Sequence, residues 1–96
     1  MFKLIKIDGT SMSPEYNSGD FLIIRKVLRT HLIKKGKNIL IDHSKYGRII
    51  KKVIYKDIIN QSFTVGGNNS SSTSISKLGS IHFSQVIGVP IFHFSK

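Results

Sequence analysis

Apolar residues along this chain fall into short runs that have the length of β-strands and not of helices. Phe2 to Ile7 alternates apolar residues with lysines, as a half-buried strand does. Five further runs are rich in β-forming residues and are separated by turn residues such as those at 17–20 and 35–38. These runs cover residues 21–24, 39–41, 48–55, 62–65 and 86–94. The pattern predicts one mainly β domain spanning residues 1–96, built from six short strands.

Composition narrows the class of protein. A chain of 96 residues suits one domain, and its 40% hydrophobic and 21% charged residues are ordinary for a globular fold. The absence of cysteine excludes disulfides and thiolate metal sites, and the four histidines are scattered, so we expect no metal. No run approaches the roughly 18 apolar residues that span a membrane. The residues before Ile7 are too few for a signal peptide. We therefore expect a soluble, cytoplasmic protein without a transmembrane segment.

The charge balance raises a second possibility. A net charge of +10 favours nucleic acid or an anionic surface as a partner. The lysines are spread along the chain, however, and the six Phe and three Tyr lie mostly in apolar runs, which places them in the core. We therefore expect no nucleic-acid partner, and a basic β-fold that binds nucleic acid stays as an alternative.

The first candidate site is the segment from Gly9 through Ser11, Met12 and Pro14, followed by Gly19-Asp20. A serine just after a strand and a glycine is placed for nucleophilic attack, and Gly9 allows close backbone approach to a ligand. The backbone at Gly9 and Ser11 can then direct an amide towards a developing oxyanion. The alternative is a strand-to-turn junction with an N-capping serine.

The second candidate is Lys51, which lies among the apolar residues of the 48–55 run. Burial disfavours the charged amine and lowers its pKa, so a neutral lysine can accept a proton from a serine hydroxyl. Lys51 and Lys52 point to opposite faces of a strand, so only one of them faces the site. The alternative is a pair of solvent-facing lysines on an edge strand.

The third candidate is the segment from Gly66 to Gly79, which is dense in hydroxyl and amide side chains. Such groups can hold a neutral lysine amine towards the nucleophile. Taken alone, the serine-rich stretch 70–76 is typical of a flexible loop.

Taken together and in this order, the three segments resemble the signal peptidase I family of Ser/Lys proteases. The resemblance puts Ser11 at the nucleophile and Lys51 at the general base, and it implies a compact, signal peptidase/LexA-like fold of short coiled antiparallel strands. In the family, the serine at the Ser72 position hydrogen-bonds the lysine, so the resemblance implies that Ser72, with Ser74, orients Lys51. The matching motif positions are Met12, Pro14, Gly19, Asp20, Lys52, Gly66, Asn68 and Gly79.

The sequence also departs from the family pattern. Lysine stands at 52 where arginine is usual, and Gly67 and Asn69 replace an aspartate and an arginine. Ser74 and Ser76 stand where the family has an Asp and an Arg that form a supporting ion pair. An alternative is therefore a catalytically impaired relative.

The resemblance implies a serine endopeptidase that needs no cofactor and cuts a precursor protein bound as an extended strand. A short form without a membrane anchor is similar to the maturation proteases of nickel-type superoxide dismutase, which remove an N-terminal pro-segment. The alternatives are a general type I signal peptidase-like enzyme and the related self-cleaving repressors. The sequence lacks the Ala-Gly or Cys-Gly cleavage segment of those repressors. The oligomeric state stays open.

Overall fold

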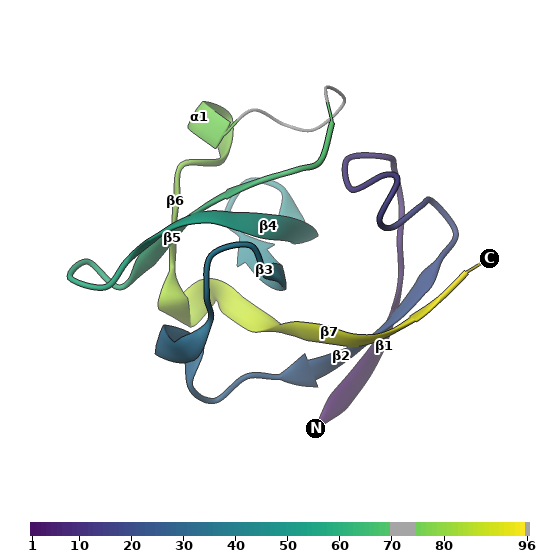
Figure 1. The fold of residues 1–96 in the computed structure, drawn as a ribbon, viewed down its shortest axis with the longest axis horizontal. Helices are drawn as coiled ribbons and strands as arrows, with labels where there is room; N and C mark the ends of the chain where they lie inside the picture. Colours follow the sequence, from purple (N-terminus) through teal and green to yellow (C-terminus); the bar gives the residue numbers. More distant parts are fainter. Residues whose placement is uncertain (70–74, 96) are drawn as a thin grey trace.

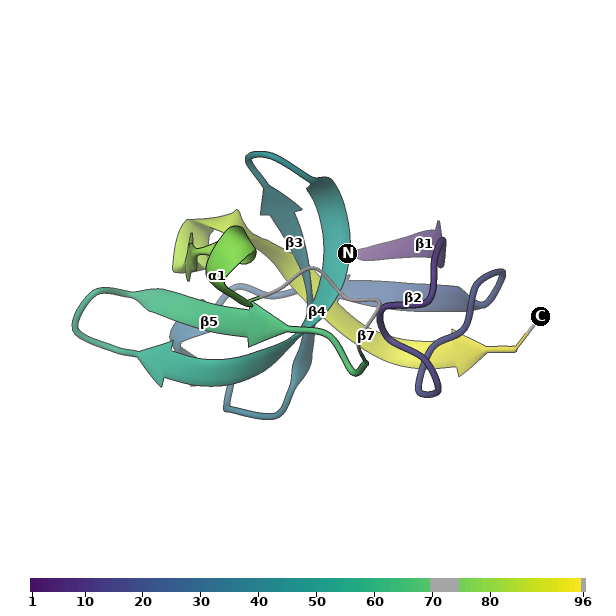
Figure 2. The same ribbon diagram turned by 90° about the horizontal axis from the view of Figure 1, so that it is seen from above.

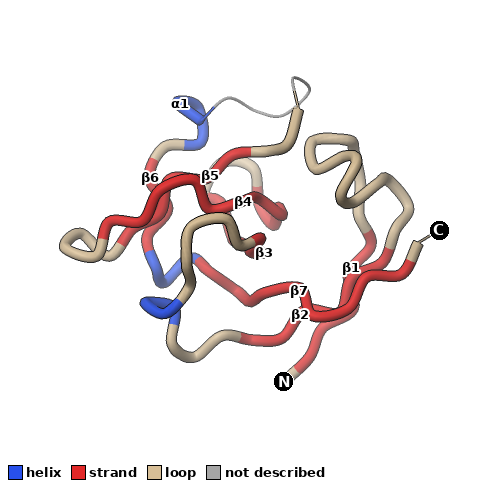
Figure 3. Tube along the Cα trace, in the orientation of Figure 1, coloured by secondary structure: helices blue, strands red, loops and turns tan. Residues whose placement is uncertain are grey.

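A computed structural model describes residues 1–69 and 75–95. In these residues seven antiparallel strands form one curled sheet in the order β1-β2-β7-β3-β4-β5-β6 (Figures 1 and 3). The strands are β1 (Phe2–Lys6), β2 (Phe21–Lys26), β3 (Asn38–His43), β4 (Gly47–Asp57), β5 (Ser62–Gly66), β6 (Ser80–His82) and β7 (Val86–Phe94). The helical elements are one turn each: η1 (Thr30–Leu32), α1 (Ile75–Leu78) and η2 (Phe83–Gln85). The predicted mainly β fold is confirmed. Strand β6 was not predicted, because three residues are too few to show a period.

Strand β7 joins the two halves of the sheet, which Figure 2 shows from above. Its residues pair with β2 on one side and with β3 on the other. Gly88 belongs to both pairings, opposite Lys26 in β2 and Leu40 in β3. A Cβ atom at Gly88 would lie 2.3 Å from the carbonyl oxygen of Arg25. Glycine is therefore required where the strands approach most closely.

The core consists of two buried clusters separated by β3. Ile39 and Ile41 belong to the cluster that includes Phe63 and Phe83, whereas Leu40 belongs to the cluster that includes Met12. Side chains alternate along a strand, so β3 contributes to both clusters and is buried on both faces. The continuous apolar run 39–41 reflects that position.

The aromatic residues contradict the sequence-based expectation that they fill the core. Only Tyr16, Phe63 and Phe83 are buried. The exposed aromatic residues are Phe2, Phe21, Tyr46, Tyr55, Phe92 and Phe94. Their apolar runs form strands that have one face in the core and one in solvent, so a run of apolar letters did not distinguish the two faces. Among the described residues, no helix is long and apolar enough to cross a membrane.

Candidate active site

The candidate nucleophile Ser11 lies on the loop between β1 and β2, which we call the Ser11 loop (residues 8–20). Gly9 opens this loop with a φ of +89°, a conformation that side-chain-bearing residues rarely adopt. Met12, directly after Ser11, is 3% exposed and belongs to the same buried cluster as Ile50. Ile50 precedes Lys51 on β4, so the core holds the Ser11 backbone near this strand.

Backbone hydrogen bonds join the two ends of the Ser11 loop. The amide of Ile7 donates to the carbonyl of Asp20 at 2.7 Å, and the amide of Gly19 donates to the carbonyl of Ile7 at 2.9 Å. The Asp20 carboxylate is 4% exposed; its Oδ2 accepts from the Asn17 amide at 3.0 Å and lies 2.7 Å from Nε2 of His93 on β7. The motif residues Gly19 and Asp20 therefore hold the base of the loop. Pro14 lies exposed on its outer turn.

Lys51 is buried in the middle of β4, with 3% of its surface exposed. It lies directly opposite Ile39, a core residue of β3. Desolvation by this burial lowers the pKa of the Lys51 amine from its usual 10.5. A lysine in this position is easier to deprotonate than a surface lysine, which is the property that a general base requires.

Lys52 has a different role from its neighbour. Its amine lies 3.3 Å from a carboxylate oxygen of Glu15, on the Ser11 loop. Desolvation raises the pKa of Glu15, but hydrogen bonds from Asn38, Asn68 and Lys52 outweigh it and lower the pKa overall. Glu15 is therefore a carboxylate that holds the Ser11 loop against β3 and β4. Of the two neighbouring lysines, Lys52 therefore contacts the Ser11 loop, whereas Lys51 is buried.

The segment after β5 clasps the Ser11 loop through two asparagines. The Asn68 amide donates to the Ser11 carbonyl at 2.8 Å, and its side chain donates to the Met12 carbonyl at 3.0 Å. The side chain of Asn69 donates to the carbonyls of Thr10, at 2.6 Å, and Ser13, at 2.9 Å. Asn68 and Asn69 thus donate to the carbonyl groups of the four successive residues 10–13. Asn69, which stands where the resembled family has arginine, takes part in this arrangement.

The contacts of the described residues, 1–69 and 75–95, do not use the amide N–H or the hydroxyl of Ser11 as a donor, whereas the neighbouring Ser13 hydroxyl donates to Asn17 at 2.9 Å. The described contacts do not include a hydrogen bond between the Ser11 hydroxyl and the Lys51 amine. They tie the Ser11 loop to β4 through the Glu15–Lys52 ion pair and to the segment after β5 through Asn68. Catalytic hydrogen bonds are often long before substrate binds and tighten in the complex.

The remaining predicted positions are distributed around this arrangement. Gly66 ends β5 opposite Lys52, and Gly79 follows α1, where its amide donates to the Ile75 carbonyl at 3.2 Å. Ser72 and Ser74, the residues predicted to orient the lysine, lie outside the described residues. Their role stays a prediction.

Three of the four histidines, His43, His82 and His93, have structural partners for their side chains. The buried His43 bonds the Leu78 carbonyl through Nε2 at 2.8 Å and accepts from the Lys45 amide through Nδ1, so it connects β3 to α1. His82 caps η2, and His93 pairs with Asp20. Within the described parts of the chain, no group of three or more His, Asp or Glu residues could hold a metal ion.

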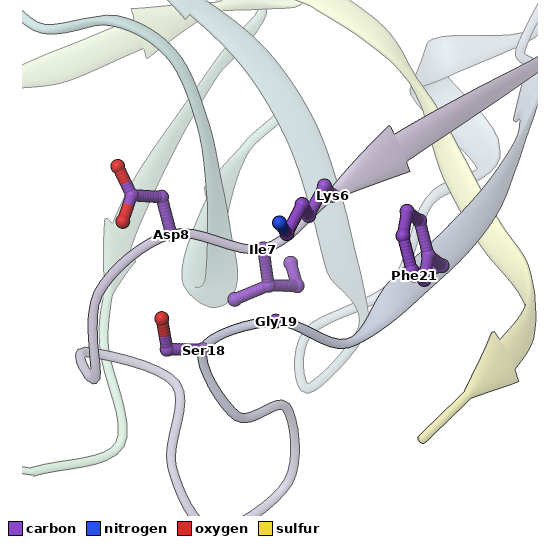
Figure 4. A pocket seen from close by; sticks show the side chains of 6 residues that line it. All are labelled: Lys6, Ile7, Asp8, Ser18, Gly19 and Phe21. Carbon is purple, nitrogen blue, oxygen red and sulfur yellow. The ribbon is translucent and has the colours of Figure 1, made fainter. Parts of the chain in front are cut away.

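A hollow of about 540 Å³ lies at the base of the Ser11 loop. Figure 4 shows its lining, which comes from the end of β1 and the start of β2: Lys6, Ile7, Asp8, Ser18, Gly19 and Phe21. The Lys6 amine, the Asp8 carboxylate and the Ser18 hydroxyl give the hollow a polar side, and the Phe21 ring gives it an apolar one. It lies beside the start of the segment that carries Ser11 and does not include Ser11 itself.

Sequence reasoning missed Glu15 and Asn38. The Asn38 side chain donates to Glu15 at 2.8 Å and to the Tyr16 hydroxyl at 3.1 Å, so β3 helps to hold the Ser11 loop. No local pattern marks either residue, because their partners are distant in sequence. No protein-family model, curated protein or solved structure matches the chain.

Proposed function

We propose that this protein is a serine endopeptidase in which Ser11 is the nucleophile and Lys51 the general base. The observation that carries the proposal is the burial of Lys51, whose amine has a lowered pKa and which lies on the strand that the Ser11 loop contacts through Glu15 and Lys52. A buried lysine is costly for a small domain. That cost, together with the Glu15–Lys52 ion pair that ties the Ser11 loop to the same strand, supports a catalytic role for Lys51.

The reaction begins when neutral Lys51 accepts the proton of the Ser11 hydroxyl. The Ser11 oxygen attacks the scissile carbonyl carbon, and the Ser11 amide donates to the resulting oxyanion. Lys51, now charged, returns the proton to the nitrogen of the leaving amine as the peptide bond breaks. Lys51 then takes a proton from a water molecule, whose oxygen attacks the acyl carbon, and it gives this proton to the Ser11 oxygen as the ester bond of the acyl-enzyme breaks. The sequence of steps uses no metal or organic cofactor.

Strand β1 supports the proposal that the substrate binds as an extended strand. It is an edge strand of the sheet that the described residues form, and it ends shortly before Ser11. The free edge of such a strand can pair with an extended peptide through main-chain hydrogen bonds. A peptide that runs along β1 towards Ser11 passes the hollow next to Asp8 and Ser18, which can accept one of its side chains.

The substrate class that we propose is a precursor protein from which an N-terminal segment is removed. Two candidates follow from the resemblance of the three motifs: the pro-form of a nickel-type superoxide dismutase and a signal-peptide precursor. No residue of the described site favours one over the other.

Incubation with each purified precursor, read by intact mass, tests this proposal. Cleavage after a pro-segment or a signal segment, at a single position, is the expected result, and the precursor that is cut identifies the class. An unchanged mass for both precursors, at several ratios of enzyme to substrate, would instead support a catalytically impaired relative.

A further inference from the structure

Four phenylalanines from three adjacent strands share one face of the sheet, which we call the aromatic face: Phe2, Phe21, Phe92 and Phe94. Phe21 on β2 lies directly opposite Phe94 on β7, and the next outward pair along these strands is Ile23 and Phe92. Phe2 on β1 lies opposite Arg25 on β2. Directly opposed residues of antiparallel strands project from the same face, so the register itself builds this surface.

The aromatic face is turned to solvent. Phe2 is 65% exposed, Phe92 61% and Phe94 52%. The rings of Phe92 and Phe94 stack with centroids 6.5 Å apart. The alternate residues of the same strands, such as Leu22 and Ile24, are buried in the core. Figure 1 shows the three strands side by side on the part of the molecule away from α1.

A basic groove opens beside the aromatic face. It has a volume of about 1,180 Å³, and Phe2 and Arg25 line it, so it is continuous with that face. The basic residues of its lining are Arg25, Lys26, Arg29, Lys34 and Lys37. All five are exposed. Glu15, the acidic residue of the lining, is engaged by Lys52. Apolar residues, among them Leu28, Leu32 and Ile91, make up much of the remaining lining, so the groove presents positive charge together with apolar surface.

We propose that the aromatic face and the basic groove bind a single-stranded nucleic acid, with bases on the phenylalanine rings and phosphates in the groove. Bases stack on exposed aromatic rings whatever their sequence, and lysine and arginine neutralise the backbone. Phe21 and Phe94 lie side by side on neighbouring strands, which are about 4.8 Å apart, so these two rings can receive neighbouring bases. Duplex DNA hides the faces of its bases from such rings. A single strand exposes them.

The shape of the surface favours nucleic acid over a lipid bilayer. An anionic bilayer is flat and touches the basic residues that surround an apolar patch. Here the basic residues line a hollow, which a flexible polyanion can enter and a flat surface cannot. The overall charge of +10 attracts polyanions from a distance.

Fluorescence anisotropy with a labelled 20-mer of thymidine tests the proposal, with a uridine 20-mer to separate DNA from RNA and a duplex as comparison. Phe92→Ser/Phe94→Ser and Arg29→Gln/Lys34→Gln should each weaken binding at least tenfold. The second variant should also reduce the salt slope of log K by about 1.4, because each lost phosphate contact in a single strand contributes about 0.7. Tyr55→Ser and Lys45→Gln/Lys77→Gln, which change exposed residues elsewhere, should stay within twofold. Circular dichroism checks that each variant is folded.

The outcome of this test is independent of the proteolytic activity, since Ser11→Ala should bind the 20-mer like the wild type. Binding of the 20-mer that is no tighter than that of the duplex, or that is unchanged in both double variants, overturns the proposal. Loss of binding to phosphatidylserine vesicles in those variants, without an effect on the 20-mers, would show a membrane surface instead. A concentration-dependent dimer of the wild type that neither double variant forms would show that this surface mediates self-association instead.

Discussion

The backbone amide of Asn68 donates a 2.8 Å hydrogen bond to the carbonyl oxygen of Ser11. This bond joins the segment after β5 to the loop after β1, two parts of the chain that are far apart in sequence. The Asn68 side chain adds a bond to the carbonyl of Met12. The segment that carries the candidate nucleophile is therefore held by groups outside its own loop.

Asn68→Ala should lower activity more than it lowers stability. It removes the bond to the Met12 carbonyl, which costs about 1 kcal/mol in the free energy of unfolding. A small displacement of Ser11 can reduce kcat by about a hundredfold. Urea denaturation and the cleavage rate measure the two effects. The control is Asn60→Ala, which removes a surface bond to Asp57 of 2.7 Å and should leave kcat unchanged. Equal losses of activity in both variants would contradict a role of Asn68 in positioning Ser11.

The buried amine of Lys51 should make stability depend on pH. Its pKa in the folded state is lower than in the unfolded chain, so the unfolded state binds the proton more tightly. The free energy of unfolding should therefore rise between the folded pKa and about 10.5, by about 1.4 kcal/mol for each unit of pKa difference. Lys51→Met should lack this rise. Urea denaturation at pH 7 to 10.5 tests it, and parallel pH curves for variant and wild type would refute the expected linkage.

Gly88→Ala should destabilise the fold strongly. Its Cβ would lie 2.3 Å from a backbone oxygen of Arg25, and backbone cannot move aside as a side chain can. We expect a loss of about 3 kcal/mol or more. Gly66→Ala is the matched control, because its nearest neighbour is a side-chain atom of Ile75 at 3.2 Å. Thermal unfolding of both variants compares them, and equal melting temperatures would show that β7 can be displaced from β2.

Asp20→Ala should destabilise the base of the Ser11 loop. The carboxylate is buried, accepts from the Asn17 amide, and pairs with His93, so its removal leaves partners without an acceptor. Bonds to charged groups of this kind contribute about 2 kcal/mol. Asp42→Ala, which changes an exposed aspartate on β3, should have little effect. Chemical denaturation of the two variants gives the difference, and similar midpoints would contradict this role for Asp20.

The sequence predicted the strands well because their apolar runs are local signals. The run at 39–41 identified β3, and the run at 48–55 identified most of β4. The sequence could not give the register, which depends on contacts between distant strands. It therefore missed that Phe21 and Phe94 share an exposed face, and it assigned such aromatic residues wrongly to the core.

The sequence also predicted only those parts of the candidate site that short, local motifs mark. Ser11 and Lys51 were recognised from short motifs, and the burial predicted for Lys51 from its apolar neighbours is confirmed. The partners that hold the site were not recognisable. Glu15 bonds to Asn38 and Lys52, and nothing in the residues around Glu15 indicates either contact. The predicted roles of Ser72 and Ser74 fall outside the described residues.

The most direct test of the Ser11–Lys51 dyad is cleavage of a precursor, followed by intact mass, with four variants that form two matched pairs. Ser11→Ala and Lys51→Ala should abolish cleavage, whereas Ser13→Ala and Lys52→Arg should retain most of it. Lys52→Arg changes the neighbouring lysine but keeps a positive charge beside Glu15. Folding is verified for each variant by circular dichroism. Full cleavage by folded Ser11→Ala or Lys51→Ala, or loss of cleavage only in Ser13→Ala or Lys52→Arg, would contradict the assignment of nucleophile and base.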